Sequence, residues 1–264
     1  VPNEHKQAVL DDLVNNIMVV HDGHLGIGEV GLKFMVEALT DNGRSDVVYT
    51  MATQTDYPGW GDILSKGFTT LIEMWDGTGS HNHIMWGTIE EWFYKALAGI
   101  DVDAQAPGYK NVIIKPHVVG DLTWAKASVD TIRGKVASSW EKKGNSLTLN
   151  VTIPVNSTAK IYVPKLGMKN VVVKEGGKIV WHNGAQVKDV PGITAVKETA
   201  AYVQFETGSG FYRYEIAEAA PAEQANRKVR RLGIKEYVDK MKAGWIGQMA
   251  GVGYGAPTEF GWQG

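Results

Sequence analysis

The chain has 264 residues, 44% of them hydrophobic, which is enough to bury the core of one large domain or of two to three small ones. Its formal net charge is −2 and it has no polybasic run, so we expect neither nucleic acid nor an anionic membrane surface as a partner. The sequence has no cysteine, which excludes disulfides, thiolate zinc sites and cysteine nucleophiles. No apolar run approaches the roughly 18 residues of a membrane span, and we expect any signal peptide to lie outside this chain.

The first 105 residues predict short helices separated by polar or glycine-rich loops. Apolar residues at spacings of three and four mark one face of each helix: Leu10, Leu13, Val14, Ile17 and Met18; Phe34, Met35, Ala38 and Leu39; Val47, Val48, Met51 and Ala52; Met85, Ile89, Trp92, Phe93 and Ala96. Asp41-Asn42-Gly43 and Gly99 are the expected ends of two of these helices. Helix pairs joined by functional loops are typical of an α/α barrel.

A glycine pattern between the first two helices permits another interpretation. Residues 26–31 fit the dinucleotide fingerprint G-x-G-x-x-G, Ile17 to Val20 could form the strand before it, and Asp46 follows about 20 residues later. However, the fingerprint requires its first glycine directly after the strand and its acidic residue at the end of a second strand. Neither requirement is met, so we expect a loop between two barrel helices instead.

One carboxylate lies within an apolar stretch. Glu73 has Leu71, Ile72, Met74 and Trp75 as neighbours, and apolar surroundings favour a carboxyl group that exchanges protons near neutrality. Polar groups follow closely, in Asp76 and in Ser80-His81-Asn82-His83. With nine tryptophans and ten tyrosines available to stack on sugar rings, this combination predicts a sugar-hydrolysing site. The competing interpretation is that Glu73 is an ordinary residue at the end of a helix or strand.

The hydrophobic period changes from helical to alternating after Ala106-Pro107-Gly108. Predicted strands follow at residues 112–114, 147–153, 159–163, 171–173, 178–181, 202–205 and 211–216, and the glycines of Gly144-Asn145 and Gly176-Gly177 predict hairpin turns. Residues 106–216 are therefore expected to form an antiparallel β-sandwich. His117 and His182 stand alone in this region, so we interpret them as packing or surface residues.

Six segments of the first hundred residues stand in an order that resembles a known family. They are His24-Leu25-Gly26-Ile27-Gly28-Glu29-Val30-Gly31, Leu39-Thr40-Asp41-Asn42-Gly43-Arg44-Ser45-Asp46, Gln54-Thr55-Asp56-Tyr57-Pro58-Gly59-Trp60-Gly61, the Glu73 stretch, Ser80-His81-Asn82-His83 and Leu97-Ala98-Gly99-Ile100. Together they resemble the end of the catalytic domain of α-L-rhamnosidases of glycoside hydrolase family 78, over roughly residues 4–165. The resemblance implies the C-terminal part of an (α/α)6 barrel in residues 1–105, followed by the C-terminal β-domain of that family.

The resemblance also implies an activity and its residues. The family releases terminal α-L-rhamnose from rhamnosides with inversion, and an inverting glycosidase needs one protonated acid and one base that activates water. By its place in the motif Glu73 is the expected general base, and Trp60, Trp75, Asn82 and His83 are expected to line the rhamnose subsite. His81 replaces an aromatic residue that is frequent in the family. No residue matches the general acid, so we expect an upstream barrel segment or a second chain to supply it.

The C-terminal residues predict a linker and the start of another domain. Residues 217–228 are rich in Ala and Glu and poor in large apolar side chains, as in a linker. Residues 229–264 resemble the opening helix and loop of ADP-ribosylglycohydrolase-like proteins, but an Asp frequent in that family is replaced by Gly253. Because this segment is too short to form such a domain, we assign it no activity.

Two alternatives remain open at this stage. A metal site could be assembled from His21, His24, His81 and His83 with Asp76, although no H-E-x-x-H helix is present and we expect neither a metal nor another cofactor. The chain could also be a non-catalytic carbohydrate-binding or structural remnant of a rhamnosidase. Metal content and binding without turnover are the observations that would separate these alternatives.

Overall fold

The computed structural model describes residues 1–182, 184–187 and 190–219, together with positions 235, 238, 239 and 242. The chain divides into two compact units, Val1–Ala219 and Ala220–Gly264. Most of the predicted linker and of the segment 229–264 lies outside the described residues, so both remain predictions. In the part of the chain that is described, no helix is both long and apolar enough to cross a bilayer.

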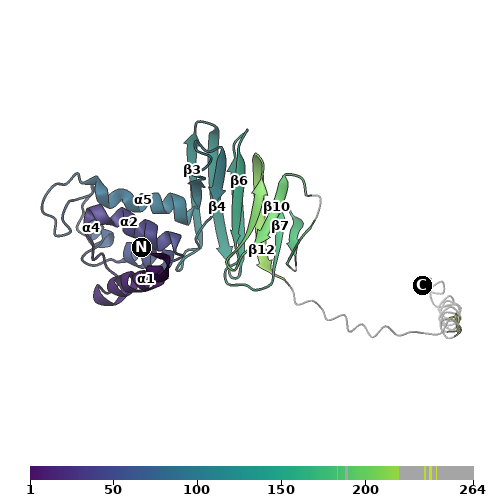
Figure 1. Ribbon diagram of the computed structural model, residues 1–264, viewed down its shortest axis with the longest axis horizontal. Helices are drawn as coiled ribbons and strands as arrows, with labels where there is room; N and C mark the ends of the chain where they lie inside the picture. The colour runs from purple at the N-terminus through teal and green to yellow at the C-terminus, as the bar shows by residue number, and fades with distance from the viewer. Residues whose placement is uncertain (183, 188–189, 220–234, 236–237, 240–241, 243–264) are drawn as a thin grey trace, which may run out of the picture. The chain divides into compact units, whose positions relative to one another are not determined.

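Helices make up the first part of the larger unit (Figure 1). The α-helices are α1 (Lys6–Asn15), α2 (Glu29–Asp41), α3 (Ser45–Thr53), α4 (Trp60–Ser65) and α5 (Ile89–Trp92). Two 3-10 turns, η1 (Asn3–His5) and η3 (Ile84–Thr88), and two π-helical turns, η2 (Asn16–Val20) and η4 (Phe93–Leu97), extend or join them. The four helical segments predicted from the sequence are found in the predicted order, and α4 is a fifth α-helix.

Helix α2 shows how the apolar spacing selects its buried face. Leu32, Met35, Val36 and Leu39 are buried, whereas Phe34 and Ala38, which we expected on this face, are exposed. Phe34 lies about 200° around the helix from Leu32, because each residue advances the helix by roughly 100°. The helix ends as predicted, since Gly43 has a φ of +75° and the next amide, of Arg44, donates a hydrogen bond to the Leu39 carbonyl at 2.7 Å.

Twelve strands in two sheets follow in the described residues. Their bounds are β1 (Ile100–Val102), β2 (Asn111–Ile114), β3 (Trp124–Thr131), β4 (Gly134–Lys143), β5 (Ser146–Ile153), β6 (Thr158–Pro164), β7 (Val171–Glu175), β8 (Lys178–His182), β9 (Ala185–Gln186), β10 (Ile193–Glu198), β11 (Tyr202–Thr207) and β12 (Gly210–Glu218). One sheet has the order β1-β2-β6-β11-β10, and the other β3-β4-β5-β12-β7-β8-β9. The predicted β-sandwich is confirmed, but β1, β3, β4, β9 and β10 were missed.

Glycine turns close two of the hairpins, and one strand pair is parallel. Hairpins join β4 to β5 through Gly144 and β7 to β8 through Gly176 and Gly177, and all three glycines have positive φ, as turns of this kind require. The pairing is not wholly antiparallel, because β2 runs parallel to β6, with Ile114 opposite Ile161. Parallel neighbours need a long connection, and here β3, β4 and β5 of the other sheet supply it.

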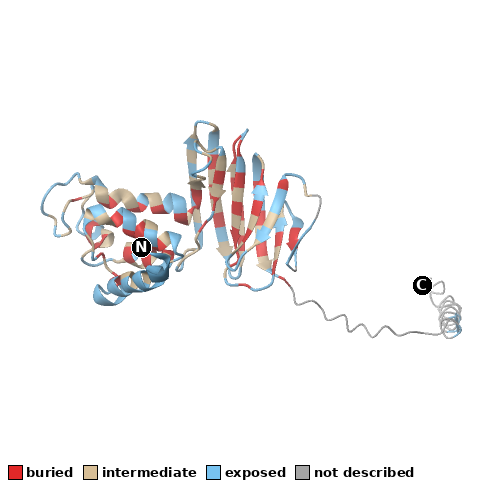
Figure 2. Cartoon of the chain, viewed as in Figure 1, coloured by how far each residue is buried: buried red, intermediate tan, exposed pale blue. Residues whose placement is uncertain are grey.

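Buried apolar side chains form two separate clusters (Figure 2). The sandwich cluster lies between the two sheets and includes Trp140, Phe205 and Tyr214. The helical cluster includes Leu39, Val48 and Trp92. Strand β5 alternates regularly between half-buried and buried residues, as expected for a strand with one face on a core.

Hydrogen bonds link the helical region to the sandwich. The Trp140 indole N–H donates to the Leu97 carbonyl at 2.7 Å, and the Ser138 hydroxyl donates to the Ala98 carbonyl at 2.6 Å. The Ser45 hydroxyl at the start of α3 lies 2.7 Å from His117 Nδ1. Burial, reinforced by the positive charge of Lys115, lowers the pKa of His117 from 6.5 to about 4. His117 is thus a packing residue, as predicted.

Candidate active site

Glu73 lies in the 66–83 loop, which connects α4 to η3. The two arms of this loop are joined by backbone hydrogen bonds, from the Glu73 amide to the Ser80 carbonyl at 2.7 Å and from the His83 amide to the Leu71 carbonyl at 2.9 Å. Ile72 is fully buried and anchors the first arm. The loop therefore presents Glu73 and His83 side by side, from paired arms.

The Glu73 carboxylate is held by the loop itself. Its Oε2 accepts a hydrogen bond from the Ser80 amide at 2.9 Å. A Cβ at Gly79, whose φ is +78°, would lie 2.8 Å from the same oxygen, so the loop needs glycine there. The expected apolar enclosure is not found among the described residues, because the Glu73 side chain is 40% exposed and Met74 is also exposed.

His83 lies between two carboxylates. Its Nδ1 is 4.0 Å from Glu73 Oε2, and its Nε2 is 2.9 Å from Oε2 of Glu29, the first residue of α2. Both Nε2 and the Glu29 oxygen are shielded from solvent, and their 2.9 Å contact is not aligned as a hydrogen bond. A protonated His83 would therefore form an ion pair with Glu29.

Three tryptophans surround the backbone of Glu73. The rings of Trp60 and Trp75 meet edge to face at 5.7 Å between centroids, and those of Trp75 and Trp86 lie at 4.4 Å. The Trp86 indole N–H donates to the Glu73 carbonyl at 3.1 Å, and that of Trp60 donates to the Trp86 carbonyl at 3.3 Å. Trp86 thus contacts Trp60, Trp75 and the Glu73 carbonyl, and so links two predicted subsite residues to Glu73.

The remaining polar residues of the loop mostly stabilise its turn. Asp76 accepts hydrogen bonds from the Thr78 hydroxyl and amide, which lower the pKa of its carboxyl group. His81 Nε2 lies 3.1 Å from the Gly77 carbonyl, and its ring packs edge to face against Phe68. Asn82 is exposed, and its backbone N–H donates to the Ser80 hydroxyl at 3.2 Å. The side chain of Asn82 is therefore accessible to a ligand.

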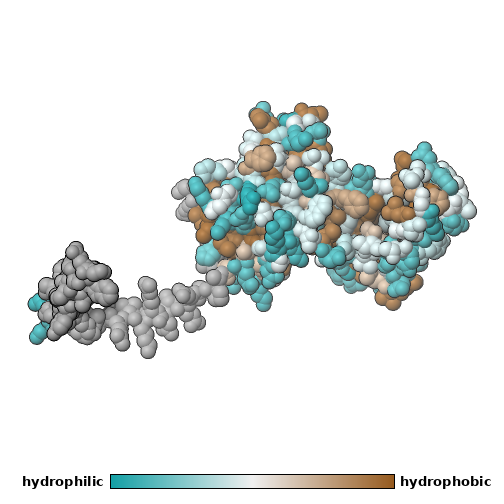
Figure 3. Space-filling view, turned by 180° about the vertical axis from the view of Figure 1, so that it is seen from behind, coloured by the Kyte–Doolittle hydropathy of each residue, from teal (hydrophilic) through white to brown (hydrophobic). Residues whose placement is uncertain are grey.

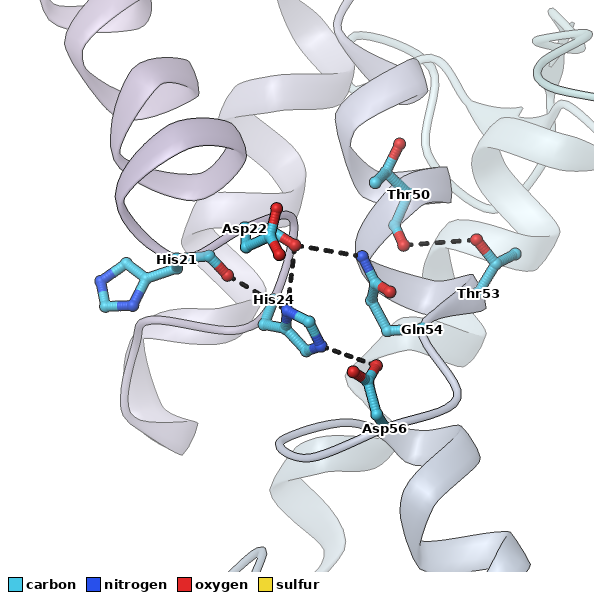
Figure 4. A network of polar contacts seen from close by, with 7 residues as sticks. All are labelled: His21, Asp22, His24, Thr50, Thr53, Gln54 and Asp56. Atoms are coloured by element: carbon cyan, nitrogen blue, oxygen red, sulfur yellow. Dashed lines mark hydrogen bonds and ion pairs between the residues drawn. The ribbon is translucent and has the colours of Figure 1, made fainter.

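A second polar network, shown in Figure 4, ties the segment before α2 to the segment before α4. His24 Nε2 lies 2.9 Å from Asp56 Oδ1, and its Nδ1 lies 3.1 and 3.0 Å from the carbonyls of His21 and Asp22. The hydrogen bond that His24 donates to the Asp56 carboxylate raises the pKa of His24 above 6.5, although partial burial opposes it, and the pKa of Asp56 is lowered. This network positions the loops that lead to Glu29 and Trp60.

The structure does not favour the metal and dinucleotide alternatives. The described residues contain no group of three or more His, Asp or Glu side chains that could hold a metal ion. Ile17 to Val20 belong to a π-helical turn rather than a strand, and Gly28 is the residue before α2. Gly26 and Gly28 thus lie in a helix-to-helix connection, as expected, whereas Gly31 lies within α2.

One cavity of the described residues lies between α2, α5 and the sandwich, away from Glu73. It has a volume of about 440 Å³ and is lined by α2, α5 and the sandwich, with Lys33, Glu91, Lys95 and His117 among its residues. None of its lining residues belongs to the 66–83 loop. The charged side chains that line it pair with one another, since Lys33 lies 3.3 Å and Lys95 2.7 Å from Glu91. We therefore place the candidate site at Glu73, on the chemistry of its side chains.

Sequence reasoning missed two residues of this site. Trp86 was not singled out because an apolar residue in a helical series is ordinarily a core residue. Glu29 was read only as part of a glycine-rich segment, since its partner His83 is 54 positions away in the chain. An acidic residue opening a helix is a common helix-dipole feature and carries no signal of a distant partner.

Two family models match consecutive parts of the chain. The bacterial alpha-L-rhamnosidase 6 hairpin glycosidase domain matches residues 1–97, and the bacterial alpha-L-rhamnosidase C-terminal domain matches residues 99–178. The change from one model to the other coincides with the change from the helical region to the sandwich.

Individual relatives agree with these models. An alpha-L-rhamnosidase of Streptomyces avermitilis is 30% identical over 82% of this chain and 20% of its own length, and one of Formosa agariphila is 36% identical over 61% and 18%. The solved structure of alpha-L-rhamnosidase from Dictyoglumus thermophilum is similar with a TM-score of 0.75 at 37% identity, over 83% of this chain and 24% of that one. The crystal structure of the Streptomyces avermitilis enzyme complexed with L-rhamnose has a TM-score of 0.69 at 29% identity, over 81% and 20%. The chain thus spans about a fifth to a quarter of the relatives it matches.

Proposed function

Because residues 1–178 match the six-hairpin and C-terminal domains of bacterial α-L-rhamnosidases, the chain belongs to that family, and we propose that it contributes to the release of terminal α-L-rhamnose from rhamnosides with inversion of configuration. The observation that carries this proposal is the solvent-accessible Glu73 carboxylate, held beside His83 and a cluster of tryptophans. An accessible carboxylate beside aromatic rings is suited to activate water in a sugar-hydrolysing site.

Each site residue has a proposed role. Glu73 is the general base, because the Ser80 amide fixes one of its oxygens while the side chain still reaches solvent. Trp60 and Trp75 supply apolar walls against which a sugar ring can pack. His83 and Asn82 supply hydrogen-bonding groups for sugar hydroxyls, from the second arm of the same loop.

The general acid is proposed to come from outside these 264 residues, from an upstream barrel segment or from a second chain. Two observations support this division. The chain spans about a fifth of its curated relatives. Large apolar side chains of the helical region, including Val19, Val30 and Phe34, are exposed, and Figure 3 shows hydrophobic patches on the surface of this region. Such surface is suited to packing against further helices.

The proposed domain division follows the same reasoning. Residues 1–105 are the C-terminal part of an (α/α)6 barrel, 106–216 the β-sandwich domain, 217–228 a linker, and 229–264 the start of an ADP-ribosylglycohydrolase-like domain. The proposed ligand is a rhamnose-containing oligosaccharide or glycoside. Neither nucleic acid nor a membrane is a proposed partner, and no cofactor enters the proposed reaction.

The test is hydrolysis of an aryl α-L-rhamnoside by this chain and by Glu73→Gln, with mass spectrometry to establish the length of the polypeptide in the sample. Loss of the general base is expected to lower kcat by roughly 10²- to 10⁴-fold. Glu90→Gln, on the exposed side of α5, is the matched control and should retain activity. Equal activity of the Glu73 variant and the wild type would contradict the proposed base.

The second candidate is a non-catalytic carbohydrate-binding or structural remnant. It is favoured by the exposed apolar side chains, because these would accompany an incomplete barrel. L-rhamnose binding without turnover in a verified 264-residue chain would support this candidate for the isolated chain. Turnover that depends on Glu73 would exclude it.

A further inference from the structure

Glu29 contacts the site from a distant part of the sequence. It opens α2, its side chain is 25% exposed, and its Oε2 lies 2.9 Å from His83 Nε2. Both atoms are shielded from solvent and have no other hydrogen-bond partner among the described residues. Buried polar atoms are costly unless paired, so each of these two atoms has the other as its available partner.

The contact leaves one ring nitrogen of His83 facing Glu73. A neutral imidazole carries one proton, and the group that accepts from one nitrogen decides that the other nitrogen is an acceptor. An ionised carboxylate has no proton to donate and can only accept, so an ionised Glu29 favours the proton on Nε2. The 2.9 Å contact is not aligned as a hydrogen bond in the structure, but the terminal torsion of a glutamate is soft, so rotation about it can align an oxygen with Nε2–H. Nδ1 is then an acceptor on the side of Glu73.

The separation of His83 Nδ1 and Glu73 Oε2 suits a bridging O–H donor. The two atoms are 4.0 Å apart, which is too far for a direct hydrogen bond but allows one oxygen to lie within hydrogen-bonding distance of both. With the proton on Nε2, both atoms that face this space are acceptors. A water molecule placed there would donate one hydrogen bond to each atom, whereas a sugar hydroxyl, which has one proton, would donate to one of them.

We infer that Glu29 is a positioning residue, which holds His83 in the Nε2-protonated tautomer so that Nδ1 and Glu73 both accept from one water at the site, or either of them accepts from a sugar hydroxyl. The inference rests on the proposed function for its biological meaning, but the tautomer does not depend on turnover. It assigns a role in the site to the first residue of α2.

The tautomer of His83 tests this inference in the full chain. Histidine ring ¹⁵N shifts at pH 8, above the ordinary titration range of imidazole, report which nitrogen carries the proton, and His83→Gln assigns the signals. We expect the Nε2–H form in the wild type. The Nδ1–H form would overturn the inference, and this measurement requires no folded Glu29 variant.

Variants of Glu29 then test the cause. Glu29→Leu is expected to shift His83 to a mixture of tautomers, whereas Glu29→Gln, whose amide oxygen can accept, should retain much of the Nε2–H form. Glu37→Leu is the control, because Glu37 lies on the same helix, is 43% exposed and pairs with Lys33 at 3.9 Å. An unchanged tautomer in a folded Glu29→Leu variant would overturn the assignment.

L-rhamnose titration separates this inference from the proposed function. If the wild type binds L-rhamnose, Glu29→Leu should weaken binding severalfold and Glu37→Leu should leave it unchanged. If Glu29→Leu binds as tightly as the wild type, the positioning role fails. If the wild type neither binds L-rhamnose nor hydrolyses a rhamnoside while His83 is in the Nε2–H form, the proposed function fails for this chain and the tautomer assignment stands.

Discussion

The β-sandwich and the helical region differ in what holds their functional and structural side chains. In the sandwich, ladder pairing and alternating burial place large residues such as Phe205 and Tyr214 between two sheets. In the helical region, individual hydrogen bonds hold the loops. The Ser80 backbone N–H donates to the Glu73 carboxylate, and His24 contacts the Asp56 carboxylate. The site lies wholly in the second region, because loops can present polar groups that a closed core would have to bury unpaired.

This difference predicts which property a substitution in each region should change. A sandwich residue contributes to a core shared by the whole sheet pair, so its loss should affect global stability. A loop residue of the helical region contributes locally, so its loss should affect binding, activity or the pH dependence more than the unfolding of the sandwich. Substitutions in each region can break or confirm this expectation.

The largest effect is expected from Phe205→Ala. Phe205 is fully buried in β11, and its ring lies 4.7 Å from that of Tyr214. Removing it should lower the free energy of unfolding by about 3–5 kcal/mol, measured by guanidinium denaturation. Phe211→Ala, at an 80% exposed position of β12, should change it by less than about 0.5 kcal/mol. Similar losses for both variants would contradict the view that the sandwich core dominates stability.

The next effect is the pH dependence caused by His117 at the junction of the two regions. Its pKa in the folded chain is about 4, below the 6.5 of the unfolded chain, so between these values only the unfolded state binds the proton. Stability should therefore fall as pH drops from 6.5 towards 4, by at most about 3 kcal/mol. Denaturation at pH 7 and pH 4.5 should show a smaller loss in His117→Asn than in the wild type.

The exposed His182 provides the control for that measurement. His182→Asn should retain the pH dependence of the wild type, because its side chain is exposed in both states. If His117→Asn and His182→Asn lose equal stability between pH 7 and pH 4.5, burial of His117 does not cause the effect.

The smallest effect is expected from Asp56→Asn, which removes the partner of His24. Because the pKa of His24 is raised on folding, its contribution to stability is present below about pH 6.5 and is lost as pH rises through the pKa of the folded chain. Because the pKa of Asp56 is lowered, its contribution to stability is present above about pH 4. The variant should lower the thermal midpoint slightly at pH 5.5 and less at pH 8.5. Asp130→Asn, an exposed residue of β3, should show no such difference, and an equal shift of Asp56→Asn at both pH values would argue against the ion pair.

Local patterns predicted much of the fold. The helical spacing of Met35 and Leu39, the Asn42-Gly43 helix end and the Gly176-Gly177 hairpin are properties of short segments, and the structure has each of them. The misses have a common cause. Strands β3 and β4 carry small and polar residues on their half-exposed faces, so alternation alone did not mark them.

For the candidate site, the sequence by itself determined the neighbours of Glu73, the order of the family segments and the short spacing that places His83 on the same loop. Only the tertiary structure decided that Glu29 meets His83, that Trp86 bonds to the Glu73 carbonyl, and that β2 runs parallel to β6. The physical reason is that hydrophobic period, capping and turn chemistry act over a few residues, whereas these contacts join segments whose approach depends on how the whole core packs.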